Sequence, residues 1–367
     1  MPTKTPDATR LPFAPLPWTP DCEELEDDEA ETARELIETM GRIAETVARD
    51  EGHAFRAVHA KGHGLLHGRL HVPALPPVLA QGVFAAPGEH AAVLRLSTSP
   101  GDLLEDSVST PRGLALKILD VAGERLDASD GAATQDFLMV NGPVFTEPNA
   151  KKFLKNLKLL AATTDKAPGT KKLLSAALRG LESLVEKAGG ESAALKAMGG
   201  HPATHPLGET YYTQVPLRHG PYMAKLSLAP VSPELLALVD APVDLGAGPH
   251  ALRDAVAAHF AGFGGTWELR AQLCLDLEKM PIEDASVRWP EDLSPFVAVA
   301  RLVVPAQSSW TSGTPGEEDR LAFNPWRGIE AHKPLGSIMR VRRKAYAMAA
   351  AFRRTRNGVA QEEPGTQ

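Results

Sequence analysis

The stretch KPLGSIMRVRRKAYAMAAAFRRTRN (residues 333–357), near the end of the chain, decides how the fold is interpreted. If residues 336–356 form an α-helix, residues three and four positions apart share one face. That face contains Met339, Arg342, Tyr346, Ala349, Ala350 and Arg353. A face that packs in a core would consist mainly of leucine and valine, whereas this one places a phenol between two arginines. Such a face indicates a function beyond packing.

The chemistry of this face allows two interpretations. Arginine beside a phenol favours the phenolate, because the guanidinium stabilises its negative charge. A phenolate is a strong ligand for iron, and the neighbouring alanines would leave room for a flat macrocycle such as haem. The stretch also contains many arginines and lysines and no acidic residue. A basic helix that lies on acidic protein, nucleic acid or lipid headgroups is therefore the alternative, and spacing alone leaves both open.

Length and composition set the limits for either interpretation. The chain has 367 residues, of which 43% are hydrophobic, which is enough for a sizeable core in one or two domains. Its net charge of −7 argues against nucleic acid as a general partner. No apolar run approaches the length of about 18 residues that a membrane span requires. The N-terminus is rich in proline and then acidic, without an apolar signal core, so we expect a cytoplasmic protein.

The order of the predicted elements indicates an α+β protein. Residues 1–20 read as an irregular arm because of their prolines, and helical spacing of apolar residues predicts helices over 29–49 and 149–200, the latter with a second segment at 170–187. Strands are predicted at 65–72, 92–96, 113–119, 210–230, 266–276 and 296–304. This order fits a largely antiparallel sheet or barrel with a helical insertion and a terminal helix. We divide the chain into an arm and helix (1–50), a single domain (51–357) and a tail (358–367).

The spacing of the histidines and cysteines argues against a metal site built from them. His59, His63, His67 and His71 lie four residues apart, which on one helix would form a metal site, but the glycines between them argue against a helix there. In a strand over 65–72, His67 and His71 would point to solvent. His59 instead stands in a loop three residues after Arg56, where functional groups are common. The two cysteines, Cys22 and Cys274, are expected to be free thiols.

Five segments, in order along the chain, resemble the motifs of haem catalases. They are RAVHAKG (56–62), AVLRLSTSPGD (92–102), TPRGLALK (110–117), VNGPVF (140–145) and RRKAY (342–346). Because the chain is short beside a full catalase, it is most similar to the minimal catalase-related haem proteins. That group includes peroxidases that use organic hydroperoxides and enzymes that rearrange fatty-acid hydroperoxides. The resemblance implies a catalase-like antiparallel β-barrel with a C-terminal proximal haem helix.

The resemblance also implies roles for individual residues, with haem b (iron protoporphyrin IX) as cofactor. Tyr346 would be the axial ligand of the iron and Arg342 its charge partner. The expected catalytic residues are His59, on the distal side of the haem, and Asn141. The other residues expected to contact the haem or the distal histidine are Arg56, Arg95 and Arg353 at the propionates, Ser97 beside the imidazole, and Val58, Phe145 and Phe153 at the ring.

One position departs from the family pattern. In an alignment without a gap on Pro143 and Phe145, the distal asparagine of catalases falls on Val140, and Asn141 follows one residue later. Either a shift of one residue brings Asn141 over the iron, or the distal side has histidine alone. Histidine alone favours chemistry with one peroxide, because disproportionation of hydrogen peroxide needs a second peroxide held in place, a task that the asparagine shares in catalases.

Three functions remain open from the sequence. The first is a haem peroxidase that reduces organic or fatty-acid hydroperoxides with a reducing co-substrate and has weak or no catalase activity. The second is a fatty-acid hydroperoxide lyase or an isomerase like allene oxide synthase, which needs no external reductant. The third is a haem-binding protein without enzymatic activity. The sequence does not determine the number of subunits, so a homo-oligomer also stays open.

Overall fold

The structure is a computed structural model, and it describes residues 14–99, 101, 103–108, 110–127, 132–161, 202–360, 362 and 364. The predicted helical segment at 170–187 lies outside these residues.

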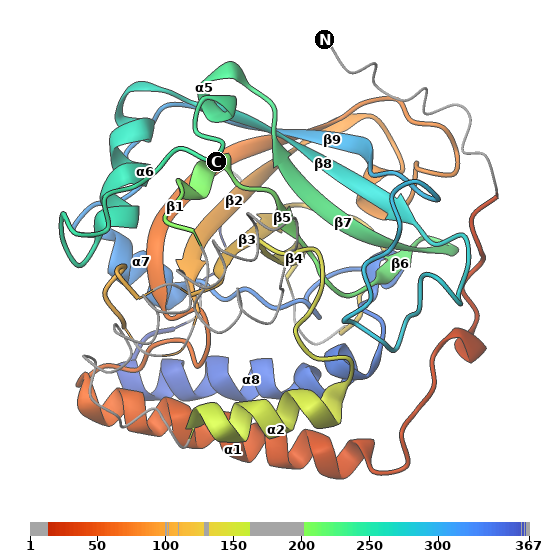
Figure 1. The fold of residues 1–367 in the computed structure, drawn as a ribbon, viewed down its shortest axis with the longest axis horizontal. Helices are drawn as coiled ribbons and strands as arrows, with labels where there is room; N and C mark the ends of the chain where they lie inside the picture. Colours follow the sequence, from red (N-terminus) through yellow and green to blue (C-terminus); the bar gives the residue numbers. More distant parts are fainter. Residues whose placement is uncertain are drawn as a thin grey trace, which may run out of the picture.

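An antiparallel β-barrel forms the centre of the fold (Figure 1). Its strands are β1 (Lys61–Val72), β2 (Gly88–Thr98), β3 (Arg112–Ile118), β4 (Gln135–Val140), β5 (Tyr211–Tyr212), β6 (Leu217–His219), β7 (Tyr222–Pro230), β8 (Gly265–Leu273) and β9 (Val297–Val304). Around the ring the order is β5-β4-β3-β2-β1-β9-β8-β7, and pairing of β7 with β5 closes it. Strand β6 extends the sheet beside β7 as a hairpin. Closure leaves no long free edge in the ring.

Alternation along β2, β3 and β4 determines which side chains face outward. Leu94, Leu96, Leu114 and Leu116 are fully buried and belong to the apolar core of the barrel. Side chains that alternate with them point to the other side of the sheet. On that outer side the strands carry buried polar residues, of which Arg95 and Ser97 are two. The outer face of these strands therefore includes buried polar residues, and it carries the candidate site.

Three helices pack together beside the barrel (Figure 1). They are α1 (Glu29–Asp50), α2 (Ala150–Ala161) and α8 (Ser337–Asn357). One apolar cluster joins Leu36 and Ile43 of α1 to Val341 and Ala345 of α8. Because this face of α8 packs against α1, the face with Tyr346 is directed elsewhere and is only partly buried.

Shorter elements complete the described chain. They are the helices α5 (Pro233–Leu236), α6 (Ala251–Gly262) and α7 (Thr314–Arg320), with 3₁₀ turns η1 (Pro20–Cys22), η2 (Gly82–Phe84), η5 (Pro206–Gly208) and η6 (Glu330–His332). None of the helices in the described ranges is long and apolar enough to cross a membrane.

The fold class expected from the sequence is confirmed, since an antiparallel barrel is combined with helices. The structure has helices where the sequence predicts them at 29–49 and 336–356. Strand β4 and helices α6 and α7 were not predicted, and the region 210–230 forms three strands instead of one, with a turn at Gly220 where φ is +62°. Both cysteines are free thiols. The division of the chain into arm, domain and tail stays a prediction.

Candidate functional site

His59 lies just before β1 in a conformation that side chains other than glycine adopt rarely. Its φ is +53°, in the left-handed region, and such residues are frequent at functional sites. Two hydrogen bonds from Arg95 hold the backbone at this position. Nη1 donates to the carbonyl of His59 at 2.9 Å, and Nη2 donates to that of Ala60 at 3.1 Å. Burial, followed by the positive charges of Arg95 and Arg342, lowers the pKa of His59 to about 3. The imidazole is therefore neutral at physiological pH.

Strand register places Ser97, Gly113 and Val140 in one row next to His59. Ser97 pairs with Gly113 across β2 and β3, and Gly113 pairs with Val140 across β3 and β4. The Oγ of Ser97 lies 3.3 Å from Nδ1 of His59. A Cβ at Gly113 would lie only 2.5 Å from the same nitrogen, so the missing side chain makes room for the imidazole. Directly paired residues share a face of a sheet, which puts Val140 on the side of His59.

The structure does not bring Asn141 to this row. Its Oδ1 accepts from the backbone N–H of Arg112 at 2.9 Å, and its Nδ2 donates to Oε2 of Glu209 at 2.7 Å. These two bonds hold the amide at the end of β4, beside the partly buried ion pair of Arg112 and Glu209. Of the two residues that the family pattern leaves open, Val140 is the one that strand register aligns with Gly113 and Ser97. The catalytic role expected of Asn141 stays a prediction.

Tyr346 lies with Arg342 and two phenylalanines near the middle of α8, on the helix face that includes Arg342 and Arg353. The Nη2 of Arg342 donates to the phenolic oxygen of Tyr346 at 2.5 Å. The guanidinium carbon lies 5.9 Å from the ring centroids of both Phe145 and Phe153, and these two rings meet edge to face at 5.3 Å. A charged donor on the phenol stabilises negative charge at that oxygen. Four of the predicted residues therefore form one cluster.

Arg56, Arg95 and Arg353 form a second cluster around the end of α7. Arg56 donates to the carbonyls of Glu318 and Leu321 at 2.9 and 3.1 Å, and Arg353 donates to that of Leu321 at 2.8 Å. Arg95 contacts the carboxylate of Glu318 at 2.6 Å. Burial and then the charge of Arg95 lower the pKa of Arg56 far below its ordinary value and that of Arg353 to about 10. The three guanidiniums thus lie close enough to repel one another.

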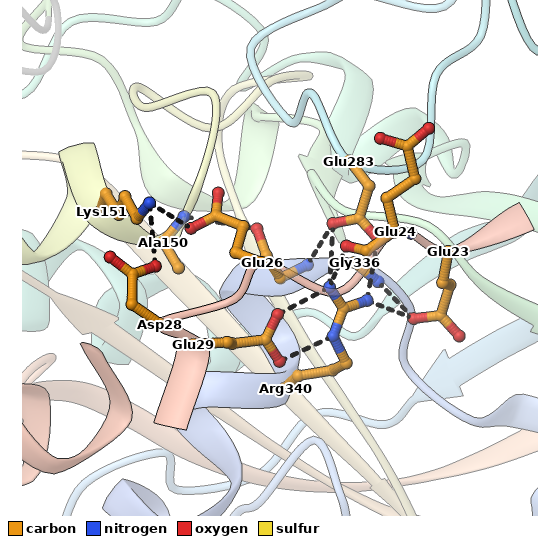
Figure 2. A network of polar contacts seen from close by, with 11 residues as sticks. Glu23, Glu24, Glu26, Asp28, Glu29, Ala150, Lys151, Glu283, Gly336 and Arg340 are labelled. Atoms are coloured by element: carbon orange, nitrogen blue, oxygen red, sulfur yellow. Dashed lines mark hydrogen bonds and ion pairs between the residues drawn. The ribbon is translucent and has the colours of Figure 1, made fainter. Parts of the chain in front are cut away.

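The start of α8 is held by carboxylates from distant segments, as Figure 2 shows. Glu23 accepts from the N–H of Gly336 at 3.0 Å, and Glu283 accepts from the N–H of Ser337 at 2.7 Å. The guanidinium of Arg340 contacts both carboxylates and that of Glu29, at 2.7 to 2.9 Å. Acidic groups satisfy N–H groups at the start of a helix and are favoured by its dipole. This network fixes the helix that carries Tyr346.

Two predicted features remain to be placed. Val58 directly precedes His59 and is partly buried, and its role stays a prediction. Among the histidines, His63 is buried against Thr98, whereas His67 and His71 are exposed and pair with Glu317 and Glu89. Within the described ranges no group of three or more histidine, cysteine or acidic side chains could bind a metal ion.

Sequence reasoning missed three contributors to the site. In the sequence, Gly113 is only one residue of a motif, and Arg340 is one of many basic residues. Glu318 lies in a helix that was not predicted. None of them has a local signal, because each acts through a residue far away in the chain: Arg95 and Glu318 are 223 positions apart.

The fold is similar to that of solved catalases. A fungal catalase is 17% identical with a TM-score of 0.57, over 84% of this chain and 61% of that one. Catalase A from Saccharomyces cerevisiae is 18% identical with a TM-score of 0.58, over 84% and 63% of the two chains. A bacterial catalase is 16% identical with a TM-score of 0.59, over 85% and 60%. At this identity the likeness shows a catalase-like fold and no more.

The comparisons also show a difference in size. This chain spans about three fifths of the length of the catalases that it matches. A scan of the sequence against protein-family models found no match, and a search of curated protein sequences found none.

Proposed function

We propose that the chain binds haem b through Tyr346 and is a peroxidase of organic or lipid hydroperoxides, of the minimal catalase-related kind. The observation that carries the proposal is the joint placement of a neutral histidine, an arginine-bound phenol and three clustered arginines. His59 lies on the barrel side, near enough to Arg342 for that charge to lower its pKa, and Arg342 bonds Tyr346 on α8. Arg342 is thus near both the imidazole of His59 and the phenol of Tyr346.

The donor set fits the chemical groups of haem. Haem has two carboxylates, and the cluster of Arg56, Arg95 and Arg353 has a surplus of positive charge. The Nε of Arg353 is buried and has no hydrogen-bond partner among the described residues, so at least one donor is left for an anion. Guanidinium groups suit carboxylates because they can bind both oxygens. Tyr346 would hold the iron, and Phe145 and Phe153 would contact the ring.

The chain's own residues would move the proton of the peroxide. Bound haem supplies an iron that polarises the O–O bond. Because Nδ1 of His59 faces Ser97, Nε2 is the nitrogen left to accept a proton from a hydroperoxide and return it to the leaving alcohol. A pKa of about 3 keeps the ring neutral and able to accept that proton. Arg342 would hold the phenol of Tyr346 in place.

The row of Ser97, Gly113 and Val140 beside His59 favours an organic hydroperoxide over hydrogen peroxide as substrate. Val140 offers an apolar side chain where a second polar group would be needed to hold a second hydrogen peroxide. A single peroxide with an apolar substituent suits such a surface, and an external electron donor would then complete the turnover. The homo-oligomer and the cytoplasmic location stay predictions.

Replacement of Tyr346 by phenylalanine tests the haem assignment. Wild type, Tyr346→Phe and the control Tyr222→Phe are each titrated with haem and followed by absorption. Tyr222 is partly buried at the start of β7, where it pairs with His219 of β6. We expect an altered haem spectrum and weaker binding for Tyr346→Phe alone. An unchanged spectrum for this variant would refute the proposal.

Peroxide assays on the same preparations separate the candidate activities. Wild type should reduce cumene hydroperoxide with an electron donor and release little oxygen from hydrogen peroxide. His59→Gln should lower the rate of reduction by about 10²-fold or more, as expected for the loss of an acid–base group. Turnover of a lipid hydroperoxide without any donor would instead identify a lyase or isomerase, and no turnover of any peroxide would identify a haem-binding protein.

A further inference from the structure

Glu318 of α7 occupies a place that a ligand carboxylate would also need. Its Oε1 accepts from Nε of Arg95 at 2.6 Å, and the side chains of the pair are 9% and 3% exposed, respectively. Arg95 uses its two other nitrogens for the carbonyls of His59 and Ala60. All three nitrogens of Arg95 are therefore engaged within the chain. Another carboxylate that binds Arg95 along its Nε edge must compete with Glu318.

The space for this carboxylate is provided by Gly62 in β1. A Cβ at Gly62 would lie 2.3 Å from Oε1 of Glu318, so a larger residue would force the carboxylate away from Arg95. The carbonyl of Gly62 accepts from Nε and Nη2 of Arg253 at 3.1 and 3.0 Å, which holds the strand in place. The Glu318 carboxylate of α7 thus lies directly against β1 at Gly62.

The remaining arginines of the cluster are not neutralised by direct contact. The contacts of Arg56 and Arg353 in the described chain are to backbone carbonyls, and Nε of Arg353 has no partner. The neighbouring acid, Asp319, pairs with His53 at 2.8 Å instead. Three guanidiniums therefore share one directly bound carboxylate. A buried surplus of positive charge favours the entry of further anions.

We propose that Glu318 is an internal counter-ion of Arg95 that a haem propionate displaces when the cofactor binds. The inference rests on the proposed function, because it takes haem as the ligand. One propionate would bind at Arg56 and Arg353, whose contacts in the described chain are to backbone carbonyls, whereas the other competes with Glu318 at Arg95. Glu318 stabilises the chain without haem and lowers its affinity for haem, and release of its carboxylate couples haem binding to α7.

The test compares Glu318→Gln with Glu317→Gln, which removes the same charge from the same helix. Glu317 is 40% exposed and pairs with His67, away from the arginine cluster. Apo-protein of each variant and of wild type is titrated with haem and with haem dimethyl ester, in which both propionates are esterified. Glu318→Gln should bind haem about tenfold more tightly, as the loss of one charge-assisted competitor predicts. Its affinity for the ester should equal that of wild type, and Glu317→Gln should match wild type for both ligands.

A second readout does not depend on haem. Urea unfolding of the apo-protein should show a lower midpoint for Glu318→Gln than for Glu317→Gln, because Arg95 loses its buried carboxylate. Equal or weaker haem binding by Glu318→Gln would overturn the inference, and so would an equal gain for the ester. If Tyr346→Phe still alters the spectrum in that case, the proposed function stands without the inference. If wild type binds no haem, both fail.

Discussion

Replacement of Arg340 by methionine should destabilise the whole fold through the start of α8. The guanidinium binds both oxygens of Glu29 at 2.9 Å, and it contacts Glu23 at 2.7 Å and Glu283 at 2.8 Å (Figure 2). It also donates to the carbonyl of Glu24 at 2.9 Å. Methionine has a similar helix propensity and a similar length, but it leaves three carboxylates near one another without a cation.

The size of the effect follows from the exposure of the network. The side chain of Arg340 is 15% exposed, and those of Glu23, Glu29 and Glu283 are 11%, 15% and 24% exposed. Removal of one partner of a fully buried pair costs about 3–5 kcal/mol, whereas an exposed pair contributes about 1 kcal/mol or less. For a partly exposed network we expect a loss of about 2–3 kcal/mol in the free energy of unfolding. In a domain of about 300 residues this lowers Tm by about 3–5 °C.

The assay is urea unfolding of the apo-protein, followed by tryptophan fluorescence, with thermal unfolding as a second measurement. Lys344→Met is the matched control, because Lys344 lies one turn further along α8 and is exposed. The control should unfold within about 0.5 kcal/mol of wild type, as surface substitutions usually do. If Arg340→Met also unfolds within that margin, the carboxylate network does not hold α8, and the reasoning is refuted.

Two further predictions concern His59 and the buried histidines. Gly113→Ala should displace the ring of His59, because the new Cβ would lie 2.5 Å from Nδ1, and it should slow hydroperoxide reduction by the haem-loaded protein. Gly88→Ala is the control and should not slow it, because nothing lies within 4 Å of a Cβ at Gly88. Equal rates for the two variants would argue against the placement of His59. Burial lowers the pKa of His219 to about 4 and that of His332 to about 3, so below about pH 6.5 the unfolded chain binds protons that the folded chain does not. The free energy of unfolding should therefore fall as the pH drops from 7 to 5, by up to about 2 kcal/mol for each histidine, and urea unfolding that is no easier at pH 5 would contradict these pKa values.

Much of the fold could be predicted from the sequence because its signals are local. Alternation of apolar residues indicated β1, short apolar runs between turn residues indicated β2 and β3, and helical spacing indicated α1 and α8. Strand β4 was missed because it begins with Gln135 and Asp136, which are polar yet buried, and Asp136 is neutralised by Lys117 on the neighbouring strand. A pattern based on hydrophobicity cannot detect a buried ion pair, because it reads each side chain without its partner.

By itself, the sequence determined the helix that places Tyr346, Arg342 and Arg353 on one face, since the spacing of neighbours in a helix depends only on positions along the chain. Only the tertiary structure decided that Val140 and not Asn141 lies in the row of His59, because strand register arises from hydrogen bonds between segments. The same is true of the contact between Arg95 and Glu318. Residues that are distant in sequence acquire a partner only when the barrel closes, and the free energy of a buried charge depends on that partner.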